Sequence, residues 1–126
     1  MPAFFRIEKK RRLVISTISG VFTLADGLAY QEKLLKDADF DPHFSQLVDC
    51  TQVTRLELGS NEVRRLAQRS IFSPDSRRAI LVSNDLVFGF ARMFVMFREA
   101  AGETGVRIFR DLDEALFWVL PENTVP

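Results

Sequence analysis

The chain has 126 residues, which is the length of one typical domain and enough to bury an apolar core without disulfides or metals. Its 17 basic and 17 acidic side chains cancel, so no overall field attracts the protein to an anionic membrane, and nucleic acid is not an expected partner. The single cysteine, Cys50, and an N-terminus whose charges follow a very short apolar stretch indicate a cytoplasmic protein rather than a secreted one. We therefore expect residues 1–126 to form one cytoplasmic domain.

The first segment of the chain predicts a β-hairpin. Apolar and polar side chains alternate over residues 5–8 and again over residues 13–18, as they do in strands that have one buried face. The basic residues 9–12 separate the two strands. Gly20 is expected to end the second strand.

A helix is predicted next, with Thr23 as its N-cap and Asp26 at a position where a carboxylate interacts favourably with the helix dipole. Asp41-Pro42 is expected to stop this helix, because proline lacks the amide hydrogen and clashes with the preceding residue. The residues predicted on its inward face are Leu24, Leu28, Leu35 and Ala38.

The middle of the chain predicts a short strand, a polar connection and a second helix. The strand covers residues 45–49, and Leu56 and Leu58 are the expected apolar anchors of the connection. Ser60 is expected to cap the helix, whose apolar positions follow the spacing of a single buried face. Those positions are Val63, Leu66, Ala67 and Ile71.

Two further strand–helix units complete the chain. Residues 79–82 form a continuous apolar run, which is typical of a central strand covered on both faces, and residues 106–109 predict a last strand. A third helix contains residues 87–97, and Asp111 with Glu114 forms a capping box for the fourth. The inward residues predicted for the fourth helix are Leu112, Ala115, Leu116 and Val119.

Strands and helices therefore alternate after the hairpin. This order implies right-handed crossovers and parallel pairing, with the hairpin as an antiparallel edge. We predict an α/β fold with a mainly parallel sheet of about five strands, an N-terminal β-hairpin and four helices.

The order of elements and one local segment resemble the STAS domain, and within it the SpoIIAA-like group of small bacterial proteins in the anti-sigma-factor antagonist superfamily. The segment is residues 47–60, LVDCTQVTRLELGS, in which Asp49 matches the aspartate at the end of a strand and Glu57 matches an acidic residue before two serines. In antagonists the second serine is phosphorylated, whereas Leu58 and Gly59 occupy the two serine positions here. The resemblance implies a SpoIIAA-like (STAS-like) fold in which the phosphoserine switch is lost.

The resemblance also implies a role. Proteins of this kind act by binding other proteins, so we expect a non-enzymatic regulatory or scaffold protein with an unidentified protein partner. The partner is expected to contact the loop between the strand and the second helix. The residues of this partner-binding loop are Asp49, Thr51, Thr54, Glu57, Leu58, Gly59 and Ser60.

The side chains that most often carry chemistry do not form a complete site in the sequence. His43 has no second histidine or cysteine at a spacing that suits a metal ion. Cys50 has no evident base to activate its thiol, and the glycines do not form a phosphate-binding loop. We expect neither a cofactor, nor a metal, nor enzymatic activity.

Residues 87–97, VFGFARMFVMF, are apolar on almost every side of their helix. One stripe can pack on the sheet, but the run is about half the length that a membrane span requires. The residues left without an assigned partner are Phe88, Met93, Val95 and Met96.

Three explanations for this second apolar face stay open. It forms a homodimer interface, where aromatic residues and methionine are enriched. Alternatively, it borders a pocket for an apolar or lipid-like ligand, which would make the protein a carrier or sensor. In the third explanation the final helix covers it with Phe117, Trp118 and Leu120.

Overall fold

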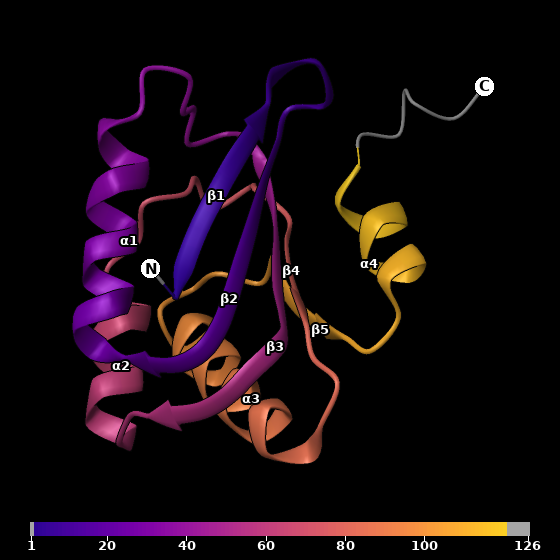
Figure 1. Ribbon diagram of the computed structural model, residues 1–126. Helices are drawn as coiled ribbons and strands as arrows, with labels where there is room; N and C mark the ends of the chain where they lie inside the picture. Colours follow the sequence, from indigo (N-terminus) through magenta and orange to yellow (C-terminus); the bar gives the residue numbers. More distant parts are fainter. Residues whose placement is uncertain (1, 121–126) are drawn as a thin grey trace.

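The computed structural model describes residues 2–120 and contains a single sheet whose strands lie in chain order, β1-β2-β3-β4-β5 (Figure 1). The first pair is antiparallel and the other three pairs are parallel. The strands are β1 (Ala3–Glu8), β2 (Leu13–Thr23), β3 (Ser45–Glu57), β4 (Arg78–Leu81) and β5 (Val106–Phe109). The predicted α/β fold, with its mainly parallel sheet and N-terminal hairpin, is confirmed.

Helices cover both faces of the sheet, three on one face and one on the other (Figure 1). They are α1 (Leu24–Lys36), α2 (Ser60–Gln68), α3 (Asp85–Ala100) and α4 (Leu112–Val119), and a 3-10 turn, η1 (Lys9–Arg11), joins β1 to β2. Alternation along β3 separates the two sides, because Val48 and Cys50 face the three helices whereas Leu47 packs under α4. α4 therefore lies too far away to cover α3, and that explanation of the apolar segment 87–97 is wrong.

β2 and β3 are longer than the sequence predicted. Gly20 does not end β2; it adopts a φ of +66° beside a register shift, and the strand continues to Thr23. β3 continues to Glu57 because the extended β2 gives it a pairing partner along its whole second half. The register shifts interrupt the alternation of apolar and polar residues, which is why the pattern indicated a loop there.

α1 ends earlier than predicted, at Lys36 rather than at Asp41-Pro42. The carboxylates of Asp37 and Asp41 accept hydrogen bonds from backbone amides two residues further on, a local arrangement that competes with helix formation. The buried leucine of its last turn is Leu34, and the predicted inward residue Leu35 is exposed. Ala38 lies beyond the helix.

The predicted caps of the first and last helices are confirmed. The Thr23 hydroxyl accepts from the Asp26 amide, and the Asp26 carboxylate accepts in turn from the Thr23 amide at 3.0 Å. The Asp111 carboxylate accepts from the Glu114 amide at 2.9 Å. In α4 the residues Ala115 and Val119 are buried as predicted, but Leu112, in the first turn, is exposed.

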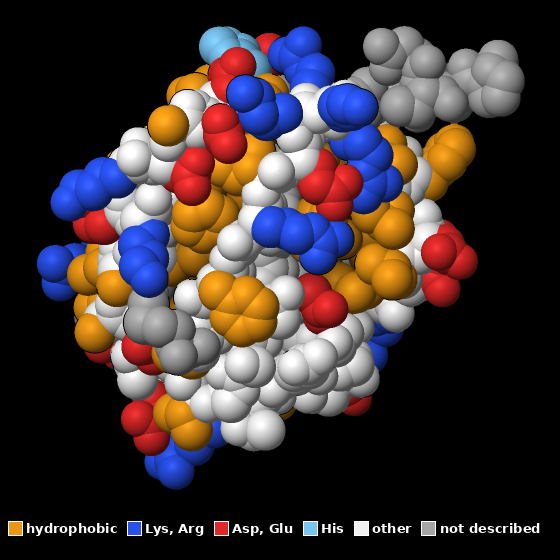
Figure 2. Space-filling view, turned by 45° about the horizontal axis from the view of Figure 1, so that its top comes forward, with side chains coloured by type: hydrophobic (Ala, Val, Ile, Leu, Met, Phe, Trp, Pro, Cys, Tyr) orange, Lys and Arg blue, Asp and Glu red, His pale blue; other side chains and the backbone are white. Residues whose placement is uncertain are grey.

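Charges of both signs are interspersed at the end of the molecule that carries η1 (Figure 2). Arg11 is bound to Glu8 at 2.6 Å, and Lys9 lies 3.4 Å from Asp39. The basic turn is therefore partly neutralised by its own surroundings. No helix within residues 2–120 combines the length and the apolar character that crossing a membrane would require.

Candidate functional site

A cavity of about 160 Å³, partly open to solvent, lies between the sheet and the three helices α1, α2 and α3. Most of its wall is apolar, and every strand except β1 contributes to it. Its apolar lining includes Ile18, Val48 and Leu56 from the strands and Leu66, Val87 and Phe94 from the helices. The predicted anchors Leu56 and Leu58 both belong to this wall.

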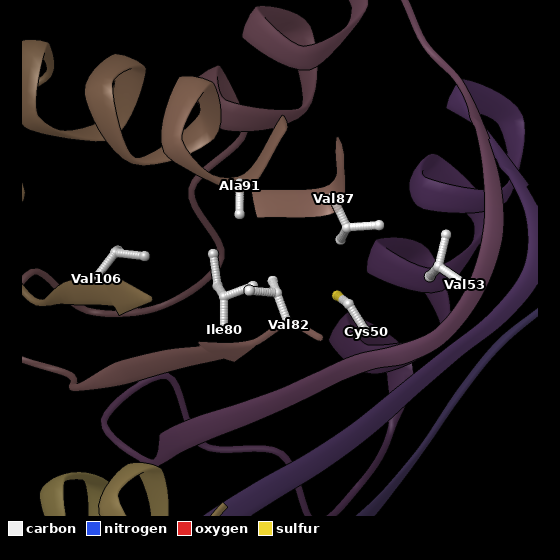
Figure 3. Packing of buried hydrophobic residues seen from close by; sticks show 7 residues of the cluster. All are labelled: Cys50, Val53, Ile80, Val82, Val87, Ala91 and Val106. Atoms are coloured by element: carbon white, nitrogen blue, oxygen red, sulfur yellow. The ribbon is translucent and has the colours of Figure 1, made fainter. Parts of the chain in front are cut away.

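Short side chains meet in the centre of this layer. Figure 3 shows that Val87 and Ala91 point from α3 toward the sheet, where Cys50 and Ile80 face them. All four side chains are buried and line the cavity. Because Val87, Ala91 and Cys50 are short, part of the space between helix and sheet stays unfilled.

Gly27 of α1 lies close to the side chains of Leu66 and Phe22 at one side of the cavity. A Cβ atom at this position would lie 2.8 Å from Cδ2 of Leu66 and 3.1 Å from Cζ of Phe22. Both neighbours line the cavity, so a side chain at residue 27 would push against its wall. A larger residue at this position would therefore require the Leu66 side chain to shift.

The cavity has a polar end formed by Tyr30 and Gln46, and the buried Ser16 hydroxyl contacts both side chains. The amide nitrogen of Gln46 donates to the Tyr30 hydroxyl at 2.8 Å and lies 3.4 Å from the Ser16 hydroxyl. The two hydroxyls also share a hydrogen bond. Burial raises the pKa of Tyr30, so the phenol stays neutral.

Arg78 adds a cation to this polar end. Its Nε donates to Oε1 of Gln46 at 3.3 Å, and its guanidinium lies 4.9 Å from the ring centroid of Phe72 and 5.8 Å from that of Phe94. Only 13% of the Arg78 side chain is exposed. Burial, together with the positive charge of Arg98, lowers the pKa of Arg78 to about 10, so the guanidinium is still charged at neutral pH.

A second buried arginine, Arg98, is paired with Glu103 behind this end of the cavity. Their side chains are 3% and 10% exposed, and Arg98 also donates to the carbonyl of Ala67. The Glu103 carboxylate accepts from the Ser70 hydroxyl at 2.9 Å and lies 3.7 Å from Nη1 of Arg78. The buried cluster thus has two cations and one anion.

One buried acceptor on the cavity wall has no donor within residues 2–120. Nε2 of Gln31 donates to the carbonyl of Leu66 at 3.4 Å, but its Oε1 has no hydrogen-bond partner among the described residues. Gln31 lines the cavity. An unsatisfied buried acceptor costs free energy, and a donor brought by water or a ligand would remove that cost.

Cys50 is buried, whereas His43 is exposed. Burial, helped by the nearby Asp49 carboxylate, raises the pKa of the Cys50 thiol to about 12, which opposes a nucleophilic role. His43 lies in an exposed connection and contacts Asp41 at 3.2 Å. Within residues 2–120 no group of three or more histidine, cysteine, aspartate or glutamate side chains is placed to hold a metal ion.

The predicted partner-binding loop is mostly strand. Asp49, Thr51, Thr54 and Glu57 belong to β3, and the Asp49 carboxylate accepts from the Thr51 amide at 2.9 Å and hydroxyl at 2.6 Å. The loop was inferred because the polar residues after Asp49 do not alternate regularly, whereas their pairing with β2 keeps them extended. Leu58 turns inward and lines the cavity.

Ser60 is not the cap of α2 but its first residue. Gly59 occupies the capping position, where its amide donates to the Glu62 carboxylate at 2.8 Å. Both Gly59 and Ser60 are exposed. A glutamate in the first turn therefore satisfies the amide at this helix end.

The predicted second face of α3 does not exist as one surface. Phe88 and Val95 pack against the buried cluster of their own chain, and Arg110 lies 4.8 Å from the Phe88 ring centroid. Met93 is half-buried, whereas Met96 is 58% exposed. The sequence pattern was misleading because both β5 and the edge of α2 accept apolar side chains from α3.

Sequence reasoning missed the polar cluster, although Arg98 carries a signal. Val87, Ala91, Phe94 and Arg98 follow one another at intervals of four, three and four residues, which places them on one side of a helix. A charged residue that continues an apolar stripe predicts a buried charge with a partner. For Tyr30, Gln46 and Arg78 the sequence contains no comparable signal.

Similarity to known proteins is limited to structure. No protein-family model matches the chain, and no curated protein matches its sequence. Its structure is similar to that of an uncharacterised protein of the DUF3478 family with a SpoIIAA-like fold from Shewanella loihica PV-4. The similarity has a TM-score of 0.63 and 21% sequence identity, and it covers 93% of each chain. The chain therefore has a SpoIIAA-like fold, as its resemblance to STAS domains implied.

Proposed function

We propose that this protein binds a small apolar or amphiphilic ligand in the cavity between the sheet and α1, α2 and α3, as a carrier or sensor. The observation that carries the proposal is the cavity itself, because protein interiors are normally packed as densely as organic crystals. Its volume of about 160 Å³ is close to that of an engineered apolar cavity of about 150 Å³ that binds benzene.

The composition of the wall supports the same conclusion. Ligand pockets are predominantly apolar and contain a few polar groups that fix orientation. Here Tyr30, Gln46 and Arg78 lie at one end, and the remainder of the wall is mainly apolar. A domain that used this layer for stability alone would gain by filling it with larger aliphatic side chains.

A titration with the neutral fluorescent probe N-phenyl-1-naphthylamine tests the proposal. The probe should bind the wild-type protein with about one equivalent at saturation, and Ala91→Leu should abolish binding by occupying the cavity. Ala100→Leu, at the exposed end of the same helix, is the matched control and should bind like wild type. Absence of probe binding to the wild-type protein, or equal binding by Ala91→Leu, would contradict the proposal.

A protein-binding regulatory or scaffold role in the cytoplasm is the second candidate. Its support is the second half of β3, since pairing with β4 ends at Asp49 and the residues beyond it pair with β2 alone. Gln52, Thr54 and Glu57 are exposed there, while Leu56 of the same strand lines the cavity. A protein docked on this strand would therefore sit directly behind a bound ligand. Homodimerisation stays a prediction.

A pull-down comparison separates this second role from ligand binding. Thr54→Arg changes only the exposed side of β3 and should weaken capture of a protein partner while leaving probe binding intact. Ala91→Leu should block the probe. Capture that is insensitive to Thr54→Arg would remove the support for docking at β3.

A further inference from the structure

The polar end of the cavity has an excess of positive charge. Glu103 is in contact with Arg98 and lies 3.7 Å from Arg78, a separation too long for a hydrogen bond. Arg78 is the charged residue among those that line the cavity. Burying a charge without a close partner costs several kcal/mol unless another group compensates it.

We propose that the ligand is an amphiphile with one carboxylate, which Arg78 binds at the polar end while the apolar part of the ligand lies along β3 toward Leu56 and Leu58. This inference rests on the proposed ligand-binding function and adds the chemical class of the ligand.

The guanidinium of Arg78 has donors available for a carboxylate. Its Nε is used by Gln46, Nη1 has only the distant Glu103, and Nη2 has no hydrogen-bond partner among the described residues. A planar guanidinium whose Nη2 has no partner within residues 2–120, and whose Nη1 makes no hydrogen bond to Glu103 at 3.7 Å, can still donate to the two oxygens of a carboxylate. The neighbouring rings of Phe72 and Phe94 limit the orientations that the guanidinium can adopt.

Gln46 links the cation to the neutral hydrogen-bonding groups. Its amide nitrogen donates to Tyr30 at 2.8 Å and its amide oxygen accepts from Arg78 at 3.3 Å, so both ends of the side chain are used. This arrangement fixes the amide orientation and holds Arg78 beside the Tyr30 hydroxyl. Gln46 is thus a positioning residue for the proposed headgroup site.

The charge count favours a carboxylate over a phosphate. Two buried arginines and one buried glutamate leave one formal positive charge, which a single carboxylate neutralises. A phosphate monoester has a charge of about −1.5 to −2 at neutral pH and would leave the cluster with an excess of negative charge.

Strand register defines the direction of the ligand. Gln46 pairs with Arg78 at the amino ends of the parallel strands β3 and β4. Leu56 lies near the carboxyl end of β3 and Leu58 follows it, at the opposite end of the cavity wall. A headgroup at Arg78 therefore places an apolar tail along β3.

The test compares octanoate with octanol, which share a chain length but differ in charge, as displacers of bound N-phenyl-1-naphthylamine. Octanoate should bind the wild-type protein at least about tenfold more tightly than octanol, because a charge-assisted hydrogen-bonded pair replaces an uncompensated charge. In Arg78→Met this preference should disappear while octanol binding is retained. Arg92→Met, an exposed position on α3, is the control and should keep the preference.

The outcomes distinguish a failure of the carboxylate inference from a failure of the ligand-binding function. Octanol binding without a preference for octanoate, or a preference that survives in Arg78→Met, would overturn the carboxylate inference and leave the ligand-binding function standing. Failure of octanoate to displace the bound probe would overturn the inference as well. A wild-type protein that binds neither the probe nor either octyl compound would overturn the ligand-binding function itself. Arg78→Met should fold, because Glu103 still has Arg98 as its partner. If the variant does not fold, the comparison of octanoate with octanol on the wild-type protein decides the carboxylate inference by itself.

Discussion

The two faces of the sheet are built in different ways. Under α4, the strand residues Leu13, Leu47 and Ala79 pack against Ala115 and Val119, and all five are almost fully buried. On the other face, three helices enclose a cavity and a buried cluster of charged and hydrogen-bonded side chains. One sheet thus supports a close-packed apolar layer and, behind it, a layer that is incompletely filled.

This difference indicates where stability and function are located. Apolar packing under α4 stabilises the fold at no cost in buried polar groups. The opposite layer includes an unfilled volume, an unsatisfied Gln31 oxygen and an excess cation, each of which lowers stability. Features that oppose stability are expected at functional sites.

Among the variants that test this difference between the two faces of the sheet, Arg98→Met is expected to change stability most. The change leaves the buried Glu103 carboxylate without its close cation and the Ala67 carbonyl without its donor. We expect the free energy of unfolding to fall by about 3–5 kcal/mol, the usual cost of breaking a buried pair on one side. Urea denaturation measures it, with Arg92→Met as the control that should change stability by less than about 0.5 kcal/mol. Similar values for the two variants would show that the Arg98 pair contributes little.

Two matched alanine substitutions test the difference in packing directly. Ala115 is fully buried under α4, so Ala115→Leu should destabilise the protein by about 1–3 kcal/mol through overpacking. Ala91 borders the cavity, so Ala91→Leu should change stability by less than about 1 kcal/mol because the added methyl groups have space. Thermal unfolding of both variants provides the measurement. Equal destabilisation would mean that the two layers are packed alike.

The smallest effect concerns the alkaline pH dependence of stability. The pKa of Cys50 is raised from 9.0 to about 12 in the folded protein, so above pH 9 the unfolded chain loses this proton more readily. The stability contributed by the neutral thiol is therefore complete below pH 9 and is lost as the pH rises toward 12. Cys50→Val should reduce the loss of stability between pH 8 and pH 10 by about 1 kcal/mol. Parallel curves for the two proteins in denaturant titrations would exclude this contribution.

The fold could be predicted largely from local signals. The Thr23 and Asp111 caps and the apolar run 79–82 are encoded within a few residues, and the structure contains the corresponding elements. The length of β2 and β3 could not be predicted because register shifts near Gly20 break the twofold alternation. Bulges are a property of paired strands and leave little trace in one strand alone.

The candidate site was not predicted. The sequence placed a candidate ligand pocket at the face of Phe88, Met93, Val95 and Met96, whereas the cavity borders Val87, Ala91 and Phe94, on the stripe that was expected to pack on the sheet. Its polar end was not predicted, because Tyr30, Gln46 and Arg78 come from three different elements and meet only in the folded chain. Contacts between residues so far apart in the chain cannot be predicted from the periodicity or the composition of the sequence.

The order of strands in the sheet has a consequence for synthesis on the ribosome. Each strand after β1 pairs with the strand that precedes it in the chain, so none of these strands has to wait for a later one before it finds a neighbour. Folding that proceeds from the N-terminus during translation can therefore extend the sheet one strand at a time. The layer under α4 is completed last, since that helix follows the final strand. An emerging chain would therefore contain α1, α2 and α3 on one face of the sheet before α4 covers the other face.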